Sequence, residues 1–256
     1  MLIAPQWPAP SRVRAACTER AGGVSLPPYD SLNLGDHVGD VPAAVARNRA
    51  LHAQALGVRP VYLKQVHGCG VVHVTAETPD GTEADACWTA EPGVACTIMV
   101  ADCLPLLLAD RDGRVVAAAH CGWRGLAGDA GQGVLETLWA TVWPQLAASS
   151  EAAAPGMLAW LGPCIGPDAF EVGPEVRAAF MATDPGADRC FRPLREGKDL
   201  ADLPALARRR LHALGITAIS GNDGSTAWCT VSQPSRFFSH RRDRVSGRLA
   251  AAIWLG

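Results

Sequence analysis

His67, Cys103 and His120 are the side chains whose types and spacing could do chemistry together. Two imidazoles and one thiolate suit a tetrahedral zinc ion whose fourth position stays open to water or substrate. Copper could bind the same ligands, because imidazole and thiolate both suit that metal as well. These three residues are therefore candidates for a catalytic metal site, with Zn²⁺ as the expected ion and Cu²⁺ as the alternative, although buried His and Cys residues are commonly structural.

Two of these ligands flank a predicted β-hairpin. Apolar runs over residues 104–109 and 115–119 lie on either side of Asp112-Gly113. This dipeptide between apolar runs is typical of a two-residue type I′ turn. Such a turn would pair Arg111 with Arg114 and thereby set the register of both strands.

The predicted register places Pro105 opposite His120. Cys103 and His120 then share one face of the hairpin as diagonal neighbours, with backbones ~7–8 Å apart. Cys121 and Asp102 fall on the opposite face. A slip of one residue would separate Cys103 from His120, so the register favours Cys103 over Cys121 as the ligand.

The residue types alone leave three other functions open. Cys103 and His120 could act as nucleophile and base of a thiol hydrolase or amidase without a metal. A copper-dependent oxidase acting on phenols is a second alternative, although a laccase needs several coppers and the chain has only seven histidines. The third is a non-catalytic binding module that zinc stabilises.

Other polar residues carry weaker signals. Arg124, at the start of a predicted helix, could hold an anion there or could be solvated. Asn33 lies in a Gly-flanked turn, where its backbone geometry is a sufficient reason for its presence. Arg241-Arg242 is expected to be a solvated face. The remaining histidines are expected to be structural or at the surface: His37, His52, His73, His212 and His240.

The elements that must position the site alternate along the chain. Helices are predicted over Pro42–Leu56 with a stop at Gly57, over Gly125–Leu146, from Pro174, and from an Asp199 N-cap to Leu214. Residues 17–40 and Ala147–Pro155 are predicted loops. Strands are predicted over residues 61–66, 71–75, 94–100, 104–109, 115–119, 157–161, 216–220 and 249–255. Because strict βαβ alternation is absent, we expect an α+β fold with mixed sheets.

Composition excludes several classes of protein. The 256 residues have a formal net charge of −2 without a basic stripe, so we expect no nucleic-acid or membrane-surface partner. No apolar run approaches the ~18–20 residues of a membrane span, and residues 1–14 lack the apolar core of a signal peptide. Nine scattered cysteines without a C-x-x-C motif indicate reduced thiols in a cytoplasm.

Eight motifs are distributed along almost the whole chain. They are residues 18–25 (TERAGGVS), 33–40 (NLGDHVGD), 64–68 (KQVHG), 83–86 (EADA), 101–105 (ADCLP), 120–125 (HCGWRG), 162–166 (GPCIG) and 237–241 (FFSHR). In this order they resemble the family once described as multi-copper polyphenol oxidases (laccase-like) and now as purine nucleoside phosphorylases. Departures are minor, with Glu19 where an uncharged residue is commoner and His240 where Tyr is common.

The resemblance implies a cytoplasmic enzyme that acts on purine nucleosides. It implies phosphorolysis of adenosine, inosine and methylthioadenosine, together with hydrolytic deamination of adenosine. The zinc ligands of the family correspond to His67, Cys103 and His120. The implied fold is a layered α+β sandwich of mixed sheets flanked by helices, which we expect to form one catalytic domain over residues 1–256, as a monomer or homodimer.

The implied reactions need further residues. Phosphorolysis requires cations that hold phosphate, and Arg49, Lys64 and Arg124 are the candidates nearest the motifs. We also expect Asn33 and Asp102 to contact substrate. Deamination needs a proton carrier beside a zinc-activated water, for which Asp102 and Asp85 are the candidates.

Overall fold

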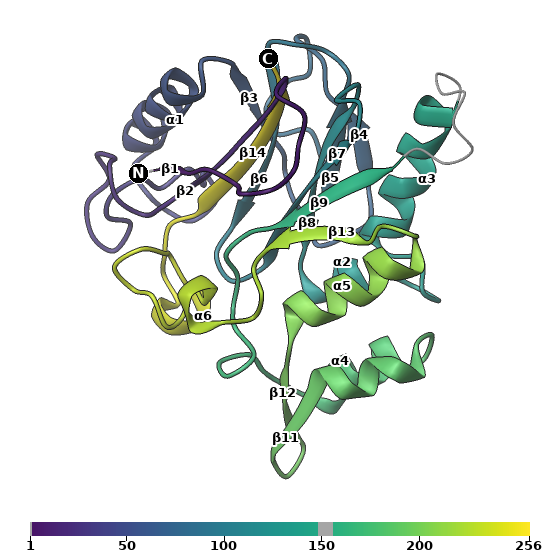
Figure 1. The fold of residues 1–256 in the computed structure, drawn as a ribbon. Coiled ribbons are helices and arrows are strands. Elements are labelled where there is room, and N and C mark those ends of the chain that lie inside the picture. Colours follow the sequence, from purple (N-terminus) through teal and green to yellow (C-terminus); the bar gives the residue numbers. More distant parts are fainter. Residues whose placement is uncertain (1, 148–155) are drawn as a thin grey trace.

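Two β-sheets stacked face to face form the centre of the protein, and helices cover their outer faces (Figure 1). The computed structural model describes residues 2–147 and 156–256. The loop expected over Ala147–Pro155 lies outside the described residues except for Ala147, which ends a helix. Within the described residues, no helix has both the length and the apolar composition that crossing a membrane requires.

The first sheet has five strands and is covered by one helix. Its strand pairs are antiparallel except for β3 and β6, which run parallel. Helix α1 (Pro42–Leu56) has the predicted bounds and ends at Gly57, whose φ of 72° is the left-handed conformation that glycine favours. The strand order is β1 (Leu2–Ile3), β2 (Val13–Thr18), β14 (Leu249–Leu255), β6 (Val94–Val100) and β3 (Arg59–Tyr62).

The second sheet has six strands and is also mixed. Its outer pairs, β13 with β9 and β4 with β5, are parallel, and the central pairs are antiparallel. The mixed sheets and flanking helices confirm the predicted α+β class. The strand order is β13 (Ala218–Gly221), β9 (Met157–Leu161), β7 (Leu104–Asp110), β8 (Val116–Cys121), β5 (Ala86–Thr89) and β4 (Val71–His73).

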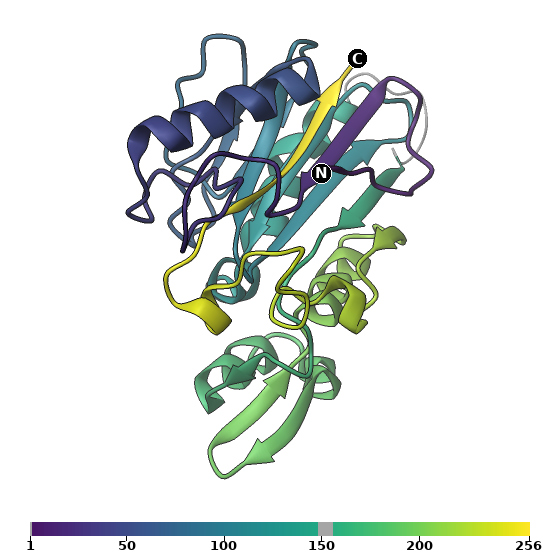
Figure 2. The ribbon, with the colours of Figure 1, turned by 90° about the vertical axis from the view of Figure 1, so that its left-hand side faces the viewer.

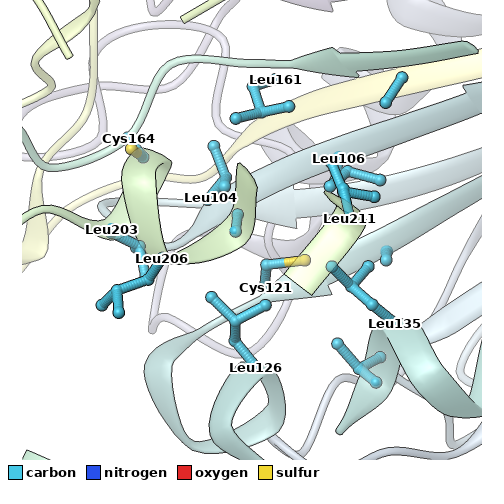
Figure 3. Close-up of a cluster of buried hydrophobic side chains, with 14 of the residues drawn as sticks. Leu104, Leu106, Cys121, Leu126, Leu135, Leu161, Cys164, Leu203, Leu206 and Leu211 are labelled. Carbon is cyan, nitrogen blue, oxygen red and sulfur yellow. The ribbon is translucent and has the colours of Figure 1, made fainter. Parts of the chain in front are cut away.

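Strand β7 shows why the apolar runs are continuous rather than alternating. Leu107 faces the core between the two sheets, whereas its neighbours Leu106 and Leu108 face the core beneath the helices. A strand buried on both faces has no solvent-facing position for a polar residue. Figure 3 shows the helical side of this core, where Leu106 lies among leucines such as Leu135 and Leu211.

The helix predicted over Gly125–Leu146 is wrong as a single element. Helix α2 (Trp123–Ala127) ends at Gly128, and α3 (Val134–Ala147) begins six residues later. A Cβ on Gly128 would lie 2.2 Å from the carbonyl oxygen of Gln132, so the chain turns through glycines between the two helices. The apolar periodicity persists across this break, which is why the sequence predicted one helix.

A three-stranded sheet and α4 (Pro174–Met181) project from one end of the molecule (Figures 1 and 2). Val176 and Phe180 of α4 are buried in the core beneath the helices. The expected N-cap at Asp199 is wrong, because Asp199 lies in β12 (Lys198–Ala201). Asp202 instead caps α5 (Leu203–Ala213), and its side chain accepts from the Ala205 N–H at 2.9 Å. The remaining elements are β10 (Glu171–Val172), β11 (Phe191–Arg195), α6 (His240–Asp243) and the 3₁₀ turns η1 (Pro185–Cys190) and η2 (Thr226–Trp228).

Candidate metal centre

The β7–β8 hairpin has the predicted register. Pro105 pairs with His120, and the ladder ends one pair further on with Leu104 opposite Cys121. Cys103 therefore directly precedes the paired residues and lies on the same face of the sheet as His120. The register prediction is confirmed for the described hairpin.

The predicted turn type is wrong, although it led to the correct register. Asp112 has no positive φ, which a type I′ turn requires, and only Gly113 is left-handed at φ 67°. The loop has four residues, because Asp110 N–H donates to the Val115 carbonyl at 3.2 Å. The buried Asp110 carboxylate also accepts from the Val115 N–H at 2.8 Å and stabilises this longer loop. Two-residue and four-residue loops keep the same parity, so the same side chains face each other.

Cys103 and Cys121 lie on opposite faces of the sheet. Cys121 is buried in the core beneath the helices, whereas Cys103 packs against the core between the sheets. Burial raises the pKa of Cys121 well above its usual value, which keeps that thiol protonated and a poor ligand.

His67, Cys103 and His120 form a group whose ligand atoms all lie within 4.8 Å of one another. The Cys103 Sγ is 3.7 Å from His67 Nε2, and the two imidazole centroids are 4.7 Å apart. His67 comes from the loop after β3 and has a left-handed φ of 61°. The burial of the group is graded, from exposed His67 through Cys103 to His120, which is 3% exposed.

Asp85 holds two of these ligands from behind. Its buried carboxylate accepts from His120 Nδ1 at 2.8 Å and from the backbone N–H groups of His67 at 2.9 Å and Gly68 at 2.7 Å. A carboxylate on one imidazole nitrogen leaves the other nitrogen free as the ligand atom, as in carboxylate–histidine–zinc arrangements. The sequence suggested Asp85 only as a proton carrier; its position before β5 is the one signal for this positioning role.

Electrostatics favour a deprotonated thiol at the centre. Burial by itself raises the pKa of Cys103, but the neighbouring His120 and His67 outweigh burial and lower it to about 6. Burial opposes the charged form of His120, but Cys103 and Asp85 raise its pKa to about 9. The same hydrogen bonds lower the pKa of Asp85 against the effect of burial. Because metals bind the thiolate, a lowered thiol pKa favours metal binding at neutral pH.

The separation of one donor pair is close to that expected around a tetrahedral ion. Zinc bonds of about 2.0–2.1 Å to nitrogen and 2.3 Å to sulfur separate neighbouring donors by roughly 3.3–3.6 Å. The 3.7 Å between Cys103 Sγ and His67 Nε2 is close to that range. Together with the mixed nitrogen and sulfur donors and the support from Asp85, the group could hold a metal ion.

Gly122 gives the ligands the space that they need. A Cβ at this position would lie 2.8 Å from His67 Cδ2 and 3.2 Å from Cys103 Sγ. We expect Gly122→Ala to displace a ligand and weaken metal binding by at least ~10-fold, measured by competition with a chromogenic chelator. Gly70→Ala is the matched control, because its Cβ would meet its nearest atom at 3.6 Å. Equal affinities for both variants would contradict this role of Gly122.

The trio opens into a cavity of about 440 Å³. This volume lies in the range of small-molecule sites, which are commonly lined by apolar side chains with a few polar groups. Apolar side chains form one part of the wall and histidines and arginines another. The lining residues are His37, Gln65, His67, Met99, Val100, Ala101, Asp102, Cys103, His120, Trp123, Ile165, Phe170, Leu203, His240, Arg241 and Arg248.

The three cations expected to hold phosphate lie outside this lining. Arg49 pairs with Asp36 at 3.2 Å and lies over the Tyr62 ring. The exposed Lys64 pairs with Glu83 at 2.9 Å. Arg124 is exposed, and its guanidinium lies over the Trp123 ring, 4.5 Å from the ring centroid.

Asn33 and Asp102, the other two residues expected to contact substrate, differ in where they lie. Asn33 is fully buried, and its side chain is used within the protein, for example to accept from the Arg248 N–H at 2.9 Å. Asp102 lines the cavity, with both oxygens accepting, from Thr230 Oγ1 and from the Arg241 N–H, each at 2.6 Å. Its φ of 87° turns it out of the strand pattern. The simple alternation that pointed Asp102 away from the site therefore does not apply.

Four polar residues of the cavity wall were not expected there. His37 and His240 were interpreted as structural or surface residues, and Arg241 as part of a solvated face, yet all three line the cavity with Arg248. The available signal was their place in or beside the motifs at residues 33–40 and 237–241. The composition of the chain and the spacing of its residues gave no other indication that these four residues line a cavity.

Comparison with known proteins shows the family to which the chain belongs. Residues 14–256 match the family described as "Multi-copper polyphenol oxidoreductase laccase". The chain is 51% identical over 256 residues to "Purine nucleoside phosphorylase PA4543" of Pseudomonas aeruginosa, covering 99% of this chain and 98% of the relative. It is 49% identical over 257 residues to "Purine nucleoside phosphorylase YfiH" of Escherichia coli, with the same coverage.

Solved structures share the fold. The Neisseria meningitidis protein NMB0706 superposes with a TM-score of 0.88 at 44% identity, over 99% of this chain and 98% of that chain. YlmD from Geobacillus stearothermophilus superposes with a TM-score of 0.83 at 31% identity, over 96% and 92%.

Proposed function

Because the chain belongs to the family described as multi-copper polyphenol oxidoreductase laccase, in which its curated relatives are named purine nucleoside phosphorylases, we propose that it is a metal-dependent purine nucleoside phosphorylase. The observation that carries this proposal is the His67–Cys103–His120 group, which opens into a cavity of about 440 Å³. The proposed substrates are adenosine, inosine and methylthioadenosine with inorganic phosphate. The proposed second activity is deamination of adenosine.

Phosphorolysis exchanges one bond at the ribose anomeric carbon. A phosphate oxygen forms a bond to C1′ while the bond from C1′ to the purine N9 breaks. The electron pair leaves with the purine, which takes up a proton, and the products are free base and ribose 1-phosphate. The apolar part of the wall, including Phe170 and Ile165, suits a purine ring, and the polar part suits the ribose and phosphate.

Deamination adds water to the purine C6 and releases ammonia. Of the two carboxylates expected to carry the proton, Asp102 lines the cavity, whereas Asp85 lies behind His120. We therefore assign proton transfer to Asp102 and the orientation of His120 and His67 to Asp85.

We propose zinc as the resident ion, held by His67, Cys103 and His120. When bound, it supplies a positive charge that polarises a substrate oxygen or water. The described residues hold one such ligand group, whereas a laccase needs several coppers, so the family description does not by itself favour phenol oxidation.

Metal analysis combined with product identification tests this function. Purified protein is incubated with adenosine in the presence and absence of phosphate. We expect about one zinc per chain, release of adenine and ribose 1-phosphate only with phosphate, and inosine with or without it. No purine product from adenosine, inosine or methylthioadenosine would contradict the proposal, and oxidation of phenols by copper-loaded protein would favour the oxidase.

The Cys103–His120 pair favours one second candidate. With the pKa of Cys103 at about 6 and that of His120 at about 9, a thiolate and an imidazolium coexist at neutral pH, as in thiol hydrolases. Removing the metal with a chelator separates the two functions. A phosphorylase should lose activity, whereas a thiol hydrolase or amidase should keep it and become sensitive to iodoacetamide.

We place the activity in the cytoplasm, as a monomer or homodimer. All nine cysteines are free, which suits a reducing compartment. Fractionation of cells and size measurement of the purified protein test these two points.

A further inference from the structure

Arg241 and Arg248 are partly buried, and neither forms an ion pair with a carboxylate within the described residues. Both line the cavity of the metal centre. A cation withdrawn from water without a counter-charge is unfavourable, so such a pair predicts an anion that is supplied from outside.

Arg248 is held rigidly on one side of its guanidinium. Its Nη1 donates to the carbonyls of Ser246 at 2.9 Å and Gly247 at 3.1 Å, and Nε and Nη2 have no partner in the part of the chain described. Its stem packs on Gly35, where a Cβ would lie 2.7 Å from Arg248 Cγ. Burial lowers the pKa of Arg248, which reflects a charge that nearby carboxylates do not fully offset.

Arg241 is held in a similar way. Its Nη1 donates to the Glu171 carbonyl at 2.9 Å, and its guanidinium lies 5.6 Å from the centroid of the Phe170 ring. Its other guanidinium nitrogens have no partner among the described residues. Its backbone N–H donates to Asp102, the residue before Cys103, so the position of Arg241 is tied to the metal centre.

The rest of the wall does not cancel this positive charge. Asp102 is the one carboxylate in the lining, and both its oxygens already accept hydrogen bonds, from Thr230 Oγ1 and from the Arg241 N–H. His37 and His240 add further nitrogen donors to the same wall. Two arginines with free N–H groups suit the oxygens of a phosphate, which guanidinium binds in a forked geometry.

We propose that Arg241 and Arg248 form a two-arginine site for the inorganic phosphate that attacks the nucleoside. This inference rests on the proposed phosphorylase function. The site holds the dianion while a phosphate oxygen bonds to C1′, the C1′–N9 bond breaks, and the electron pair leaves with the purine. Deamination uses water in place of phosphate and therefore does not need the two-arginine site.

This difference between the reactions gives the test. Arg248→Met and Arg241→Met remove the charge but keep an apolar stem, and Arg248→Lys restores a cation without the fork. We expect each Met variant to raise the KM for phosphate at least ~10-fold. Deamination of adenosine should fall far less than phosphorolysis, and Arg248→Lys should recover part of the loss. Arg192→Met is the control, because Arg192 is 62% exposed and pairs with Asp168 on the projecting sheet.

Calorimetric titration of the metal-loaded protein with inorganic phosphate supplies a readout that needs no activity. Loss of phosphate binding in both Met variants, but not in Arg192→Met, supports the site. This holds even if no purine product forms, because a missing product would contradict only the proposed function. Phosphorolysis with an unchanged KM for phosphate in both Met variants would overturn the site. An equal fall in phosphorolysis and deamination would also overturn it, since the arginines would then serve the nucleoside or the fold.

Discussion

Replacing Cys103 with alanine should remove both the bound metal and the activity. Cys103 is the one thiolate in the ligand group, and its Sγ lies 3.7 Å from His67 Nε2. Two imidazoles alone hold zinc far more weakly than two imidazoles and a thiolate. We expect metal content to fall from about one per chain to near zero, and phosphorolysis to fall by at least ~10³-fold, since several kcal/mol of transition-state stabilisation depend on the ion.

Cys121→Ala is the matched control for this change. Cys121 directly follows His120 in β8 and is fully buried, but it lies in the core on the other face of the sheet. Its truncation should lower the free energy of unfolding by about 1–2 kcal/mol through a small cavity. Metal content and activity should be retained. Equal loss of metal in both variants would contradict the assignment of the two faces.

Asp85→Asn should have the second largest effect, although Asp85 is not a ligand. Each carboxylate oxygen of Asp85 accepts two hydrogen bonds: Oδ1 from the His67 N–H and His120 Nδ1, and Oδ2 from the N–H groups of Val66 and Gly68. An amide must present its NH₂ group to one of these pairs of donors. At least one buried donor then loses its acceptor in either orientation of the amide.

We expect Asp85→Asn to weaken metal binding ~10–100-fold, because the support of a ligating histidine is lost. The free energy of unfolding of the metal-free protein should fall by about 2–4 kcal/mol, from unsatisfied buried donors. Chelator competition measures the first quantity, and denaturant unfolding after metal removal measures the second.

Glu83→Gln controls for the loss of a negative charge nearby. Glu83 is two residues from Asp85 but exposed, and it pairs only with the exposed Lys64. An exposed pair of this kind contributes roughly 0–1 kcal/mol. If Asp85→Asn behaved like Glu83→Gln in both measurements, the positioning role of Asp85 would be wrong.

The hairpin could be predicted from sequence because its determinants are local. Strand alternation and the parity of the turn place Cys103 and His120 on one face, and both depend on residues within twenty positions of one another. The turn type was wrong, but an even number of loop residues was sufficient for the register. Local sequence also determines the bounds of α1, β6, β9 and β14, which agree with the predicted ranges. Glycines interrupt the helix predicted over residues 125–146 without disturbing its apolar pattern, so this break did not show in the periodicity.

The surroundings of the ligands depend on contacts between distant segments. Asp85 meets His120 across 35 residues, and Asn33 meets Arg248 across 215. No periodicity or spacing reports such contacts, because they arise where strands far apart in the sequence pair side by side in one sheet, as β5 pairs with β8 and β2 with β14. Arg49 and Lys64 lie near motifs in the sequence but outside the cavity, whereas Arg241 and Arg248 reach it from the C-terminal part of the chain.

Residue types and local pattern were therefore enough to place Cys103 and His120 on one face of the hairpin, to set Cys103 apart from Cys121, and to predict the fold class. That the trio binds a metal stays a prediction. Only the tertiary structure decided which carboxylate supports His67 and His120 and which cations line the cavity. The physical reason is that a metal site is specified by a few side chains with distinctive chemistry. Charge compensation, by contrast, depends on every group that packing brings close. Arg49 and Lys64 have carboxylate partners, whereas Arg241 and Arg248 have none among the described residues and line the cavity.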